Sequence, residues 1–319
     1  MLIEAIQKAG SIAVGGHIRP DGDCVGSCMG LYLYVKENFP EKEIHVYLEE
    51  IPNNFKFMEH TDEILHEIPE GKIYDLFILL DLSSADRLGF SAPLYESARN
   101  TLCVDHHISN AKYAKENYIR PEASSTSELV YELLEYDKIS KAAAECLYTG
   151  MVHDTGVFRY TCTHPSTMRA AAALMEKGID FSRIITETFD EKSYLQNQVL
   201  GRALMESIRF MGGRCIVSAF RMKDMAFYQV QPKHLDGIVS QLKLTKGVDV
   251  AIFMYELEAG TFKVSLRSTE AVDVSRVARY FGGGGHMRAA GCTMAGTVHD
   301  VINNLSRQLE LQMKSGSEA

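Results

Sequence analysis

The segment HIRPDGDCVGS, residues 17–27, places a histidine and two aspartates within seven residues, directly after the apolar run SIAV. Neighbouring carboxylates repel one another and hydrate strongly, so such a loop needs either full solvation or a counter-ion. Two further apolar runs end in similar residues, one at Asp81 and one at the sequence Asp105-His106-His107. Residue types of this kind indicate metal binding and metal-assisted chemistry.

Six residues form the candidate metal-ligand set: His17, Asp21, Asp23, Asp81, His106 and Asp154. Each alone has a plainer explanation, because an aspartate after a strand is often a helix cap and a histidine is often a hydrogen-bonded core residue. Together, four carboxylates would be strongly destabilising without partners, whereas two divalent cations would neutralise them. Mixed His and Asp ligands favour Mn(II) over Mg(II). The DGD segment also lacks the further oxygen ligands of a calcium-binding loop.

The elements that must position these residues alternate along the first 160 residues. Short apolar runs, SIAVGG, EIHVYL, YDLFILLDL and TLCVDHH, are separated by helical patterns. This alternation predicts an α/β fold with a mostly parallel sheet flanked by helices. Ligands collect at the carboxyl ends of such strands, so three strands would deliver their ligands to one edge of the sheet.

The remaining sequence predicts a second, smaller domain. Residues 165–212 look entirely helical, and SYLQNQVLGRALMES is expected to form a connecting helix. After Gly212 and Gly213 a new α/β pattern begins, with a hairpin VDVAIFMYELEAGTFKVSLRS that turns at Gly260. We therefore expect a catalytic metal-binding domain over 1–190, a linker helix over 191–212 and an α/β substrate-binding domain over 213–319.

Composition narrows the class of protein. The chain of 319 residues is 46% hydrophobic, enough for a large core, yet it has no apolar stretch that could cross a bilayer and no secretory signal. We expect a cytoplasmic protein without a membrane partner. Its seven cysteines include no CxxC pair that would indicate a zinc site or a redox motif, so we expect reduced structural cysteines, with Cys24 and Cys28 as small core residues. The net charge of -9 argues against coating long nucleic acid. The acidic excess lies in residues 1–212, and a small basic excess in 213–319 suits anion binding there.

Five motifs occur in the order found in one family, and together they span nearly the whole chain. They are HIRPDGDCVGS, LLD at 79–81, VDHH at 104–107, HDTGVFRY at 153–160 and GGGGHMRAAG at 282–291. This set resembles the DHH phosphoesterase superfamily with its DHH-associated C-terminal domain. It is most similar to the short two-domain NrnA-type group, whose members degrade very short oligonucleotides and in many cases dephosphorylate 3′-phosphoadenosine 5′-phosphate (pAp).

The resemblance implies two divalent cations that share one bridging carboxylate. One ion would be held by His17, Asp21 and Asp81, and the other by Asp23, Asp81, His106 and Asp154. Two such ions would lower the pKa of a bridging water and stabilise charge on a phosphoryl group, so no protein nucleophile is needed. The implied catalytic residues are Asp81 and His106, with Asp105 orienting a ligand and His107 facing the scissile phosphate.

The glycine run is the candidate substrate loop. Four glycines often form a flexible linker, but these lie between a helical pattern and the strand-like MRAAGCTM. The amides of Gly283, Gly284 and Gly285 can approach an anion closely and form a concave nest. We expect Arg267 to bind a terminal phosphate and His286 to reach the nucleotide across an interdomain cleft. Arg87 is a further candidate, although a solvated arginine explains it equally.

We therefore expect a manganese-dependent phosphohydrolase that removes 5′-mononucleotides from short RNA oligonucleotides and cleaves pAp. A phosphodiesterase for cyclic dinucleotides, or for linear dinucleotides such as pApA, is an alternative that the ligand set does not separate. An inorganic pyrophosphatase shares the N-terminal motifs but has basic residues in place of GGGGH. A non-catalytic nucleotide sensor would be expected to lack a metal ligand, and all six are present. The sequence leaves open whether the chain forms a homodimer.

Overall fold

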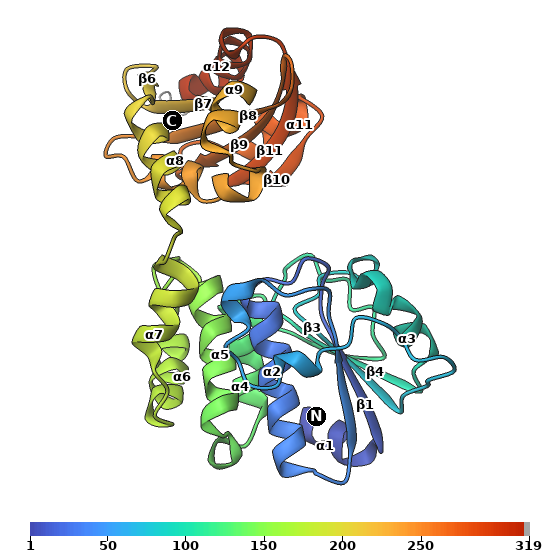
Figure 1. Cartoon of the computed structure of the whole chain (residues 1–319). Helices are drawn as coiled ribbons and strands as arrows, with labels where there is room; N and C mark the ends of the chain where they lie inside the picture. The colour runs from blue at the N-terminus through green and yellow to red at the C-terminus, as the bar shows by residue number, and fades with distance from the viewer. Residues whose placement is uncertain (316–319) are drawn as a thin grey trace. The chain divides into compact units, whose positions relative to one another are not determined.

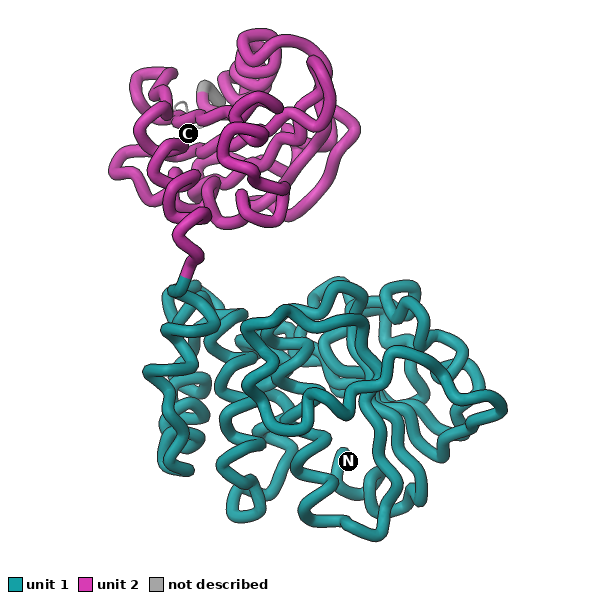
Figure 2. The backbone as a smooth tube through the Cα atoms, in the orientation of Figure 1, with its two compact units in different colours: residues 1–191 teal, residues 192–319 magenta. Residues whose placement is uncertain are grey.

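The computed structural model describes residues 1–315 and divides the chain into two compact units, Met1–Glu191 and Lys192–Ala319 (Figures 1 and 2). Each unit consists of a sheet with helices and has its own buried apolar core. The predicted α/β fold class is confirmed. The domain boundaries at 190 and 212 stay a prediction.

Unit 1 is built on a five-stranded parallel sheet with the strand order β2-β1-β3-β4-β5. Its strands are β1 (Ser11–Gly15), β2 (Glu43–Tyr47), β3 (Leu76–Leu80), β4 (Asn100–Asp105) and β5 (Glu116–Ile119). Every residue of β3, with the sequence LFILL, is buried, as expected of a central strand covered on both faces. The chain leaves β1 toward β2 on one side and continues at β3 on the other. β1 and β3 therefore flank a topological switch point, where open α/β sheets bind their ligands.

Seven α-helices lie among the described residues of unit 1. They are α1 (Leu2–Lys8), α2 (Gly22–Asn38), α3 (Ala92–Ser97), α4 (Thr126–Leu133), α5 (Lys141–Asp154), α6 (Pro165–Glu176) and α7 (Phe181–Ile185). Short 3-10 turns cover Asn53–Phe55, Thr61–Glu63, Ala85–Ser91 and Tyr136–Lys138, and a π-helical turn covers Thr186–Asp190. Helices α2, α4 and α5 lie side by side (Figure 1). At Gly26 the α2 and α5 backbones approach so closely that a Cβ atom would lie 2.5 Å from Cys146 O.

Unit 2 contains a six-stranded sheet with the order β10-β11-β9-β8-β7-β6. Its strands are β6 (Ile208–Phe210), β7 (Cys215–Phe220), β8 (Val250–Glu258), β9 (Thr261–Ser268), β10 (Gly284–His286) and β11 (Ala289–Ala295). Its helices are α8 (Tyr194–Met205), α9 (Met222–Tyr228), α10 (Ile238–Lys243), α11 (Val274–Tyr280) and α12 (Val298–Ser315), with a 3-10 turn at Pro232–Leu235. Only β7 and β8 pair in parallel. The predicted hairpin is β8–β9, with Gly260 at a φ of 74° in its turn.

The prediction that residues 165–212 are entirely helical is wrong at its end. Ile208–Phe210 forms the edge strand β6, which pairs antiparallel with β7. Gly212 and Gly213, at φ values of 64° and 84°, allow the tight turn that brings β6 back against β7. The predicted connecting helix is α8, whose Val199 and Ala203 pack in a core cluster of unit 2.

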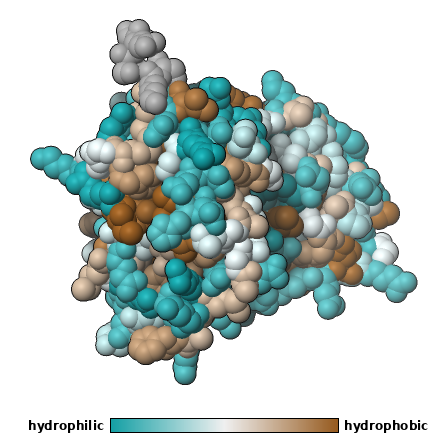
Figure 3. Space-filling model, turned by 90° about the horizontal axis from the view of Figure 1, so that it is seen from above, coloured by the Kyte–Doolittle hydropathy of each residue, from teal (hydrophilic) through white to brown (hydrophobic). Residues whose placement is uncertain are grey.

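No helix in the part of the chain that the structure describes is long and apolar enough to cross a membrane. On the face shown in Figure 3, hydrophobic residues are scattered among hydrophilic ones.

Candidate metal centre

The loop after β1 and the start of α2 supply the first side chains of the site. Asp21 is the N-cap of α2, and its carboxylate accepts hydrogen bonds from the amides of Asp23 and Cys24, each at 3.2 Å. His17 is buried, and its Nδ1 donates to Ile18 O at 2.8 Å. This bond orients the ring so that Nε2 lies 3.6 Å from Asp21 Oδ1 and 3.4 Å from Asp81 Oδ2.

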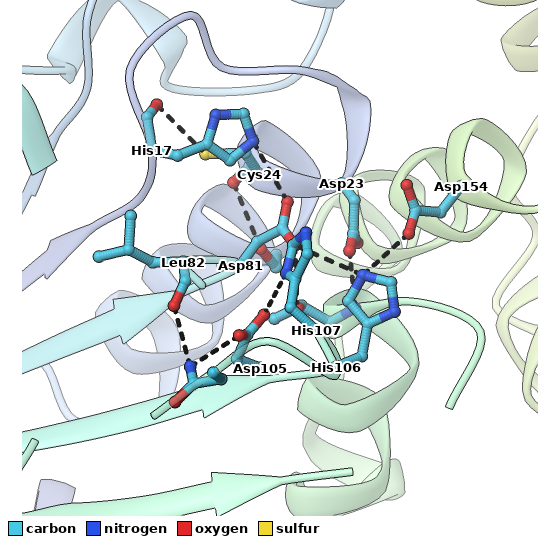
Figure 4. Close-up of polar contacts among 12 residues, drawn as sticks. His17, Asp23, Cys24, Asp81, Leu82, Asp105, His106, His107 and Asp154 are labelled. Atoms are coloured by element: carbon cyan, nitrogen blue, oxygen red, sulfur yellow. Dashed lines mark hydrogen bonds and ion pairs between the residues drawn. The ribbon is translucent and has the colours of Figure 1, made fainter. Parts of the chain in front are cut away.

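Asp81 follows β3 and lies at the centre of the cluster (Figure 4). Its side chain is buried, and its backbone has a φ of 54°, in the left-handed region that non-glycine residues seldom occupy. Its Oδ1 lies 3.6 Å from His106 Nε2 and 3.7 Å from His107 Nδ1, in addition to the contact with His17. An unusual backbone conformation that aims a carboxylate at three imidazoles is typical of a functional position.

The end of β4 supplies Asp105, His106 and His107, which have different surroundings. His106 Nε2 lies 3.0 Å from Asp154 Oδ2, at the end of α5. Asp105 is fully buried. It accepts hydrogen bonds at 2.7 Å from His107 Nδ1 and from Asn110 Nδ2. Asp105 is therefore placed to hold the His107 ring, as Figure 4 shows.

Asp23 is completely buried at the first turn of α2, and its carboxylate meets the N-terminus of α4. Its Oδ2 accepts from the Thr126 amide at 2.6 Å, and its Oδ1 accepts from the Ser127 amide at 2.9 Å. The first amides of a helix have no acceptor inside the helix, so they are suited to bind a carboxylate. The close approach of α2 and α5 then places Asp23 near His106 and Asp154.

The electrostatics of the cluster fit divalent cations. Burial and the nearby charge of Asp81 raise the pKa of Asp23 to about 7, and burial raises the pKa of Asp154 to about 6. Burial opposes protonation of His17, but Asp21 and Asp81 nevertheless raise its pKa to about 11. Several carboxyl groups are therefore too close and too buried to be ionised together unless positive charge lies among them. Imidazole nitrogens with carboxylate oxygens form a donor set that Mn(II) and similar ions accept.

Among the residues that the structure describes, three groups of side chains have ligand atoms close enough to share an ion. They are His17–Cys24–Asp81, Asp81–His106–His107 and Asp23–His106–Asp154. The structure thus brings together five of the six predicted ligands in these groups. The sixth, Asp21, has a side chain that is 61% exposed and reaches the cluster through its contact with His17.

Sequence reasoning missed several residues at this site. Cys24 is a buried core residue, and its thiol also lies beside His17 and Asp81. Thr126, Ser127 and Asn110 were not singled out, although each donates to an acidic residue of the cluster or of the sequence DHH. The signal available was the SST segment that opens α4, because small polar residues at a helix start offer free amides.

Arg87 is the predicted substrate residue that lies in unit 1. It is half-buried in the turn that follows β3, and its carbonyl accepts a hydrogen bond from the Ile18 amide at 2.8 Å. Arg87 therefore belongs to a loop that packs against the His17 loop. Its role in substrate binding stays a prediction.

The other predicted substrate residues lie on or beside β10 and β9, toward one side of the sheet of unit 2. The glycine run is not a free loop, since Gly284, Gly285 and His286 form the edge strand β10. The Gly283 amide donates to Ala278 O at 2.9 Å and so ends α11, because the last turn of a helix requires donors for its carbonyls. β10 and β11 pair, and Arg267 lies opposite Ala289 of β11. Arg267 on β9 and His286 on β10 thus lie on the two strands that flank β11, each opposite Ala289, with His286 exposed and Arg267 half-buried.

A buried cluster of carboxylates and imidazoles at the switch point of an α/β sheet is typical of metal-dependent hydrolases. Two family models match the chain: the DHH family, N-terminal domain, over residues 11–151, and the DHHA1 domain over residues 212–315. The chain therefore carries the N-terminal domain of the DHH family followed by a DHHA1 domain, which confirms the family resemblance of the sequence motifs.

Relatives and solved structures agree with this assignment over nearly the full length. The chain is 28% identical to the bifunctional oligoribonuclease and PAP phosphatase NrnA of Thermus thermophilus, covering 92% of this chain and 88% of that protein. The protein of the same name from Bacillus subtilis is also 28% identical, with 92% of each chain covered. The crystal structure of an exopolyphosphatase-related protein from Bacteroides fragilis matches with a TM-score of 0.88 at 25% identity, covering 98% of this chain and 95% of that one.

Proposed function

We propose that the chain is a cytoplasmic, manganese-dependent phosphohydrolase that removes 5′-mononucleotides from very short oligoribonucleotides and also dephosphorylates pAp. The observation that carries the proposal is the buried cluster of carboxylates and imidazoles around Asp81. It occurs in a chain whose relatives, matched over nine-tenths of its length, bear the name of that bifunctional activity. The seven free cysteines fit a reducing compartment.

The six predicted ligands are the residues that would hold two metal ions. One ion would take His17, Asp21 and Asp81, and the other Asp23, Asp81, His106 and Asp154, with Asp81 shared. Such ions, when bound, supply stabilisation of charge on a phosphoryl group and a water of lowered pKa. The mixed nitrogen and oxygen donors support manganese as the native metal.

The protein's own contribution next to these ligands is to hold His107. Asp105 accepts the Nδ1 proton of His107 at 2.7 Å, which turns Nε2 of the same ring away from Asp105. Asp105 also raises the pKa of His107. His107 is therefore oriented as a hydrogen-bond donor for an oxygen of the scissile phosphate, and Asp105 acts through it as a positioning residue.

In unit 2 we assign substrate binding to Arg267, His286 and the glycine strand β10. Arg267 carries a planar guanidinium that can bind a phosphate with two parallel hydrogen bonds. The two glycines of β10, Gly284 and Gly285, have no side chain and so allow a nucleotide to approach the backbone closely. A small number of such contacts is enough to bind a short oligonucleotide. A long nucleic-acid strand requires an extended basic surface, whereas this chain has a net charge of -9.

The test is a comparison of initial rates with Mn(II) on pAp, pApA, cyclic di-AMP and RNAs of two to twenty-four nucleotides. We expect RNAs of two to five nucleotides to be cleaved far faster than twenty-four-nucleotide RNA, with release of 5′-mononucleotides, and we expect phosphate release from pAp. Preferred cleavage of cyclic di-AMP would instead assign the chain as a cyclic-dinucleotide phosphodiesterase. Equal rates on the shortest and longest RNAs would contradict the proposed substrate class.

A further inference from the structure

The first turn of α4 joins the two most buried carboxylates among the six predicted ligands. The Thr126 amide donates to Asp23 Oδ2 at 2.6 Å, and the Thr126 hydroxyl donates to Asp81 Oδ1 at 3.3 Å. Asp23 and Asp81 come from different elements, the start of α2 and the end of β3. One threonine thus contacts both carboxylates from a third element.

The contact is shielded from water on all sides. Thr126 and Asp23 are both 0% exposed, and Asp81 is 2% exposed. A hydrogen bond to a carboxylate is stronger in such surroundings than at the surface, and a carboxylate that loses its partner there has no water to replace it. The Thr126 hydroxyl therefore restricts the rotation of the Asp81 carboxylate far more than an exposed hydroxyl would.

The position of Thr126 is itself fixed by a separate hydrogen-bond network. Ser125 is the N-cap of α4 and accepts from the Glu128 amide at 3.0 Å. The buried Glu128 carboxylate accepts in turn from the Ser124 amide at 3.0 Å and from Thr167 Oγ1, on α6, at 2.8 Å. None of these bonds involves Asp23 or Asp81. The start of α4, and with it Thr126, is therefore held in place independently of the two carboxylates.

We propose that Thr126 is a positioning residue of the metal centre, whose hydroxyl fixes the orientation of Asp81 while its amide fixes Asp23. The inference rests on the proposed function, in which both carboxylates hold metal. Removal of a hydrogen-bond partner behind a ligand weakens metal binding by about 10- to 100-fold in metalloproteins. The hydroxyl of Thr126 accordingly contributes to metal affinity and does not contact the substrate.

The test measures Mn(II) affinity without substrate, by the electron paramagnetic resonance signal of free Mn(II), in matched variants of the full chain. Thr126→Val keeps the shape and the amide but removes the hydroxyl, and we expect about 10-fold weaker binding. Thr126→Ser keeps the hydroxyl and is expected to bind within about 2-fold of the wild type. The control is Thr149→Val, since Thr149 is equally buried but its hydroxyl donates to Glu145 O at 2.7 Å within α5; its Mn(II) affinity should not change.

The comparison distinguishes a positioning role from a merely structural one. A structural role would lower the melting temperature of Thr126→Val in a chelator while its Mn(II) affinity equalled that of the wild type, and that result would overturn the inference. If Thr126→Val does not fold, Thr126→Ala is compared with Thr126→Ser, because the two differ only in the hydroxyl; equal Mn(II) affinity in this pair would overturn it as well. Failure of the wild type to bind Mn(II) or to cleave RNA would count against the proposed function instead.

Discussion

At the scale of single residues, Asp81 is the position on which the candidate metal centre most depends. Its carboxylate faces His17, in the loop after β1, and His106 and His107, which follow β4. Its backbone adopts a left-handed conformation. Aspartate and asparagine tolerate this conformation better than most other residues. Asparagine at position 81 would therefore keep the backbone while removing the negative charge.

We predict that Asp81→Asn abolishes turnover of both RNA and pAp without unfolding the protein. The reason is that one carboxylate is shared by both proposed ions. Activity assays on both substrates, with circular dichroism to verify folding, check this result. Asp86→Asn, at an exposed position of the following turn, is the control and should be as active as the wild type. Normal turnover by Asp81→Asn with metal bound would contradict the shared-ligand arrangement.

We predict that Arg267→Ala mainly raises KM, whereas His286→Ala mainly lowers kcat. A phosphate contact that is equal in the ground and transition states affects binding alone, while a contact to the scissile phosphate affects the chemical step. Steady-state kinetics on a dinucleotide separates the two effects. Arg288→Ala is the matched control, since this exposed arginine is paired with Glu270 at 2.7 Å. If both variants behave like the control, the substrate role assigned to β9 and β10 is wrong.

A residue of this site can be predicted from the sequence when its side chain has distinctive chemistry and it comes shortly after an apolar run that clearly indicates a strand. His17, Asp81 and His106 satisfy both conditions, and the structure places them together. Cys24 and Thr126 have ordinary side chains, so only their tertiary neighbours indicate a function. The sequence pattern contains no information on which hydroxyl contacts a carboxylate more than forty residues away.

At the scale of elements, the buried strands were predictable and the exposed ones were not. β1, β3 and β4 are apolar runs that are almost entirely buried. β5 and β6 are short, and no residue of either is fully buried, so their sequences lack a clear alternation. β5 is the element directly before α4. Because the sequence does not indicate β5, it also does not indicate that α4 begins at the edge of the sheet that holds the site.

We predict opposite effects for two glycine-to-alanine substitutions within helices. In Gly26→Ala the new methyl group would lie 2.5 Å from Cys146 O and 2.9 Å from Gly150 N, which are backbone atoms, so α2 and α5 must separate. We expect a loss of about 1–3 kcal/mol in the free energy of unfolding and a loss of activity. Gly201→Ala in α8 meets nothing within 4 Å and should stabilise by about 0.4–1 kcal/mol. Urea unfolding of both variants checks the prediction, and equal stability would contradict the close α2–α5 packing.

We predict a pH-dependent contribution from Asp75, which links the starts of β1 and β3. Its Oδ2 accepts from the Ser11 amide at 3.0 Å and the Gly10 amide at 2.9 Å, and these bonds lower its pKa. The ordinary pKa in the unfolded chain is about 3.9, so the ionised group stabilises the fold above that value, and this contribution is lost as the pH falls through the lower folded-state pKa.

The measurement for Asp75 is the free energy of unfolding of Asp75→Asn against pH. We expect a loss of about 1 kcal/mol at pH 7, kept small because the side chain is one-third exposed, and a difference that shrinks in acid. Asp62→Asn, at an exposed position, serves as the control. A deficit that stays constant from neutral to acidic pH would rule out the ionised carboxylate as its cause.

At the scale of the whole molecule, charge and metal binding are connected. The chain carries a net charge of -9, and several of its acidic groups are concentrated at one buried centre of unit 1. Burying like charges costs stability, which a bound cation restores. Metal occupancy should therefore matter to folding as well as to catalysis.

We predict that a chelator lowers the melting temperature of the wild type and leaves that of Asp81→Asn nearly unchanged. A ligand that binds only the folded state at 100 times its Kd stabilises by about 2.7 kcal/mol. Thermal unfolding with Mn(II) and with EDTA checks the difference, and metal analysis verifies removal. Identical curves for the wild type under both conditions would show that the cluster does not bind metal in the folded state.

The ligands of the candidate centre are spread along the chain from His17 to Asp154, and all of them lie in unit 1. Apart from Asp21 and Asp23, which are close in the sequence, the acidic ligands are far apart in an unfolded chain and meet only when β1, β3 and α5 have come together. Domains generally fold as units during synthesis, with the N-terminal one first. A ribosome-bound chain can therefore bring the ligands of the candidate centre together before Arg267 and the glycine strand have been translated, so metal loading at this centre would not have to wait for unit 2.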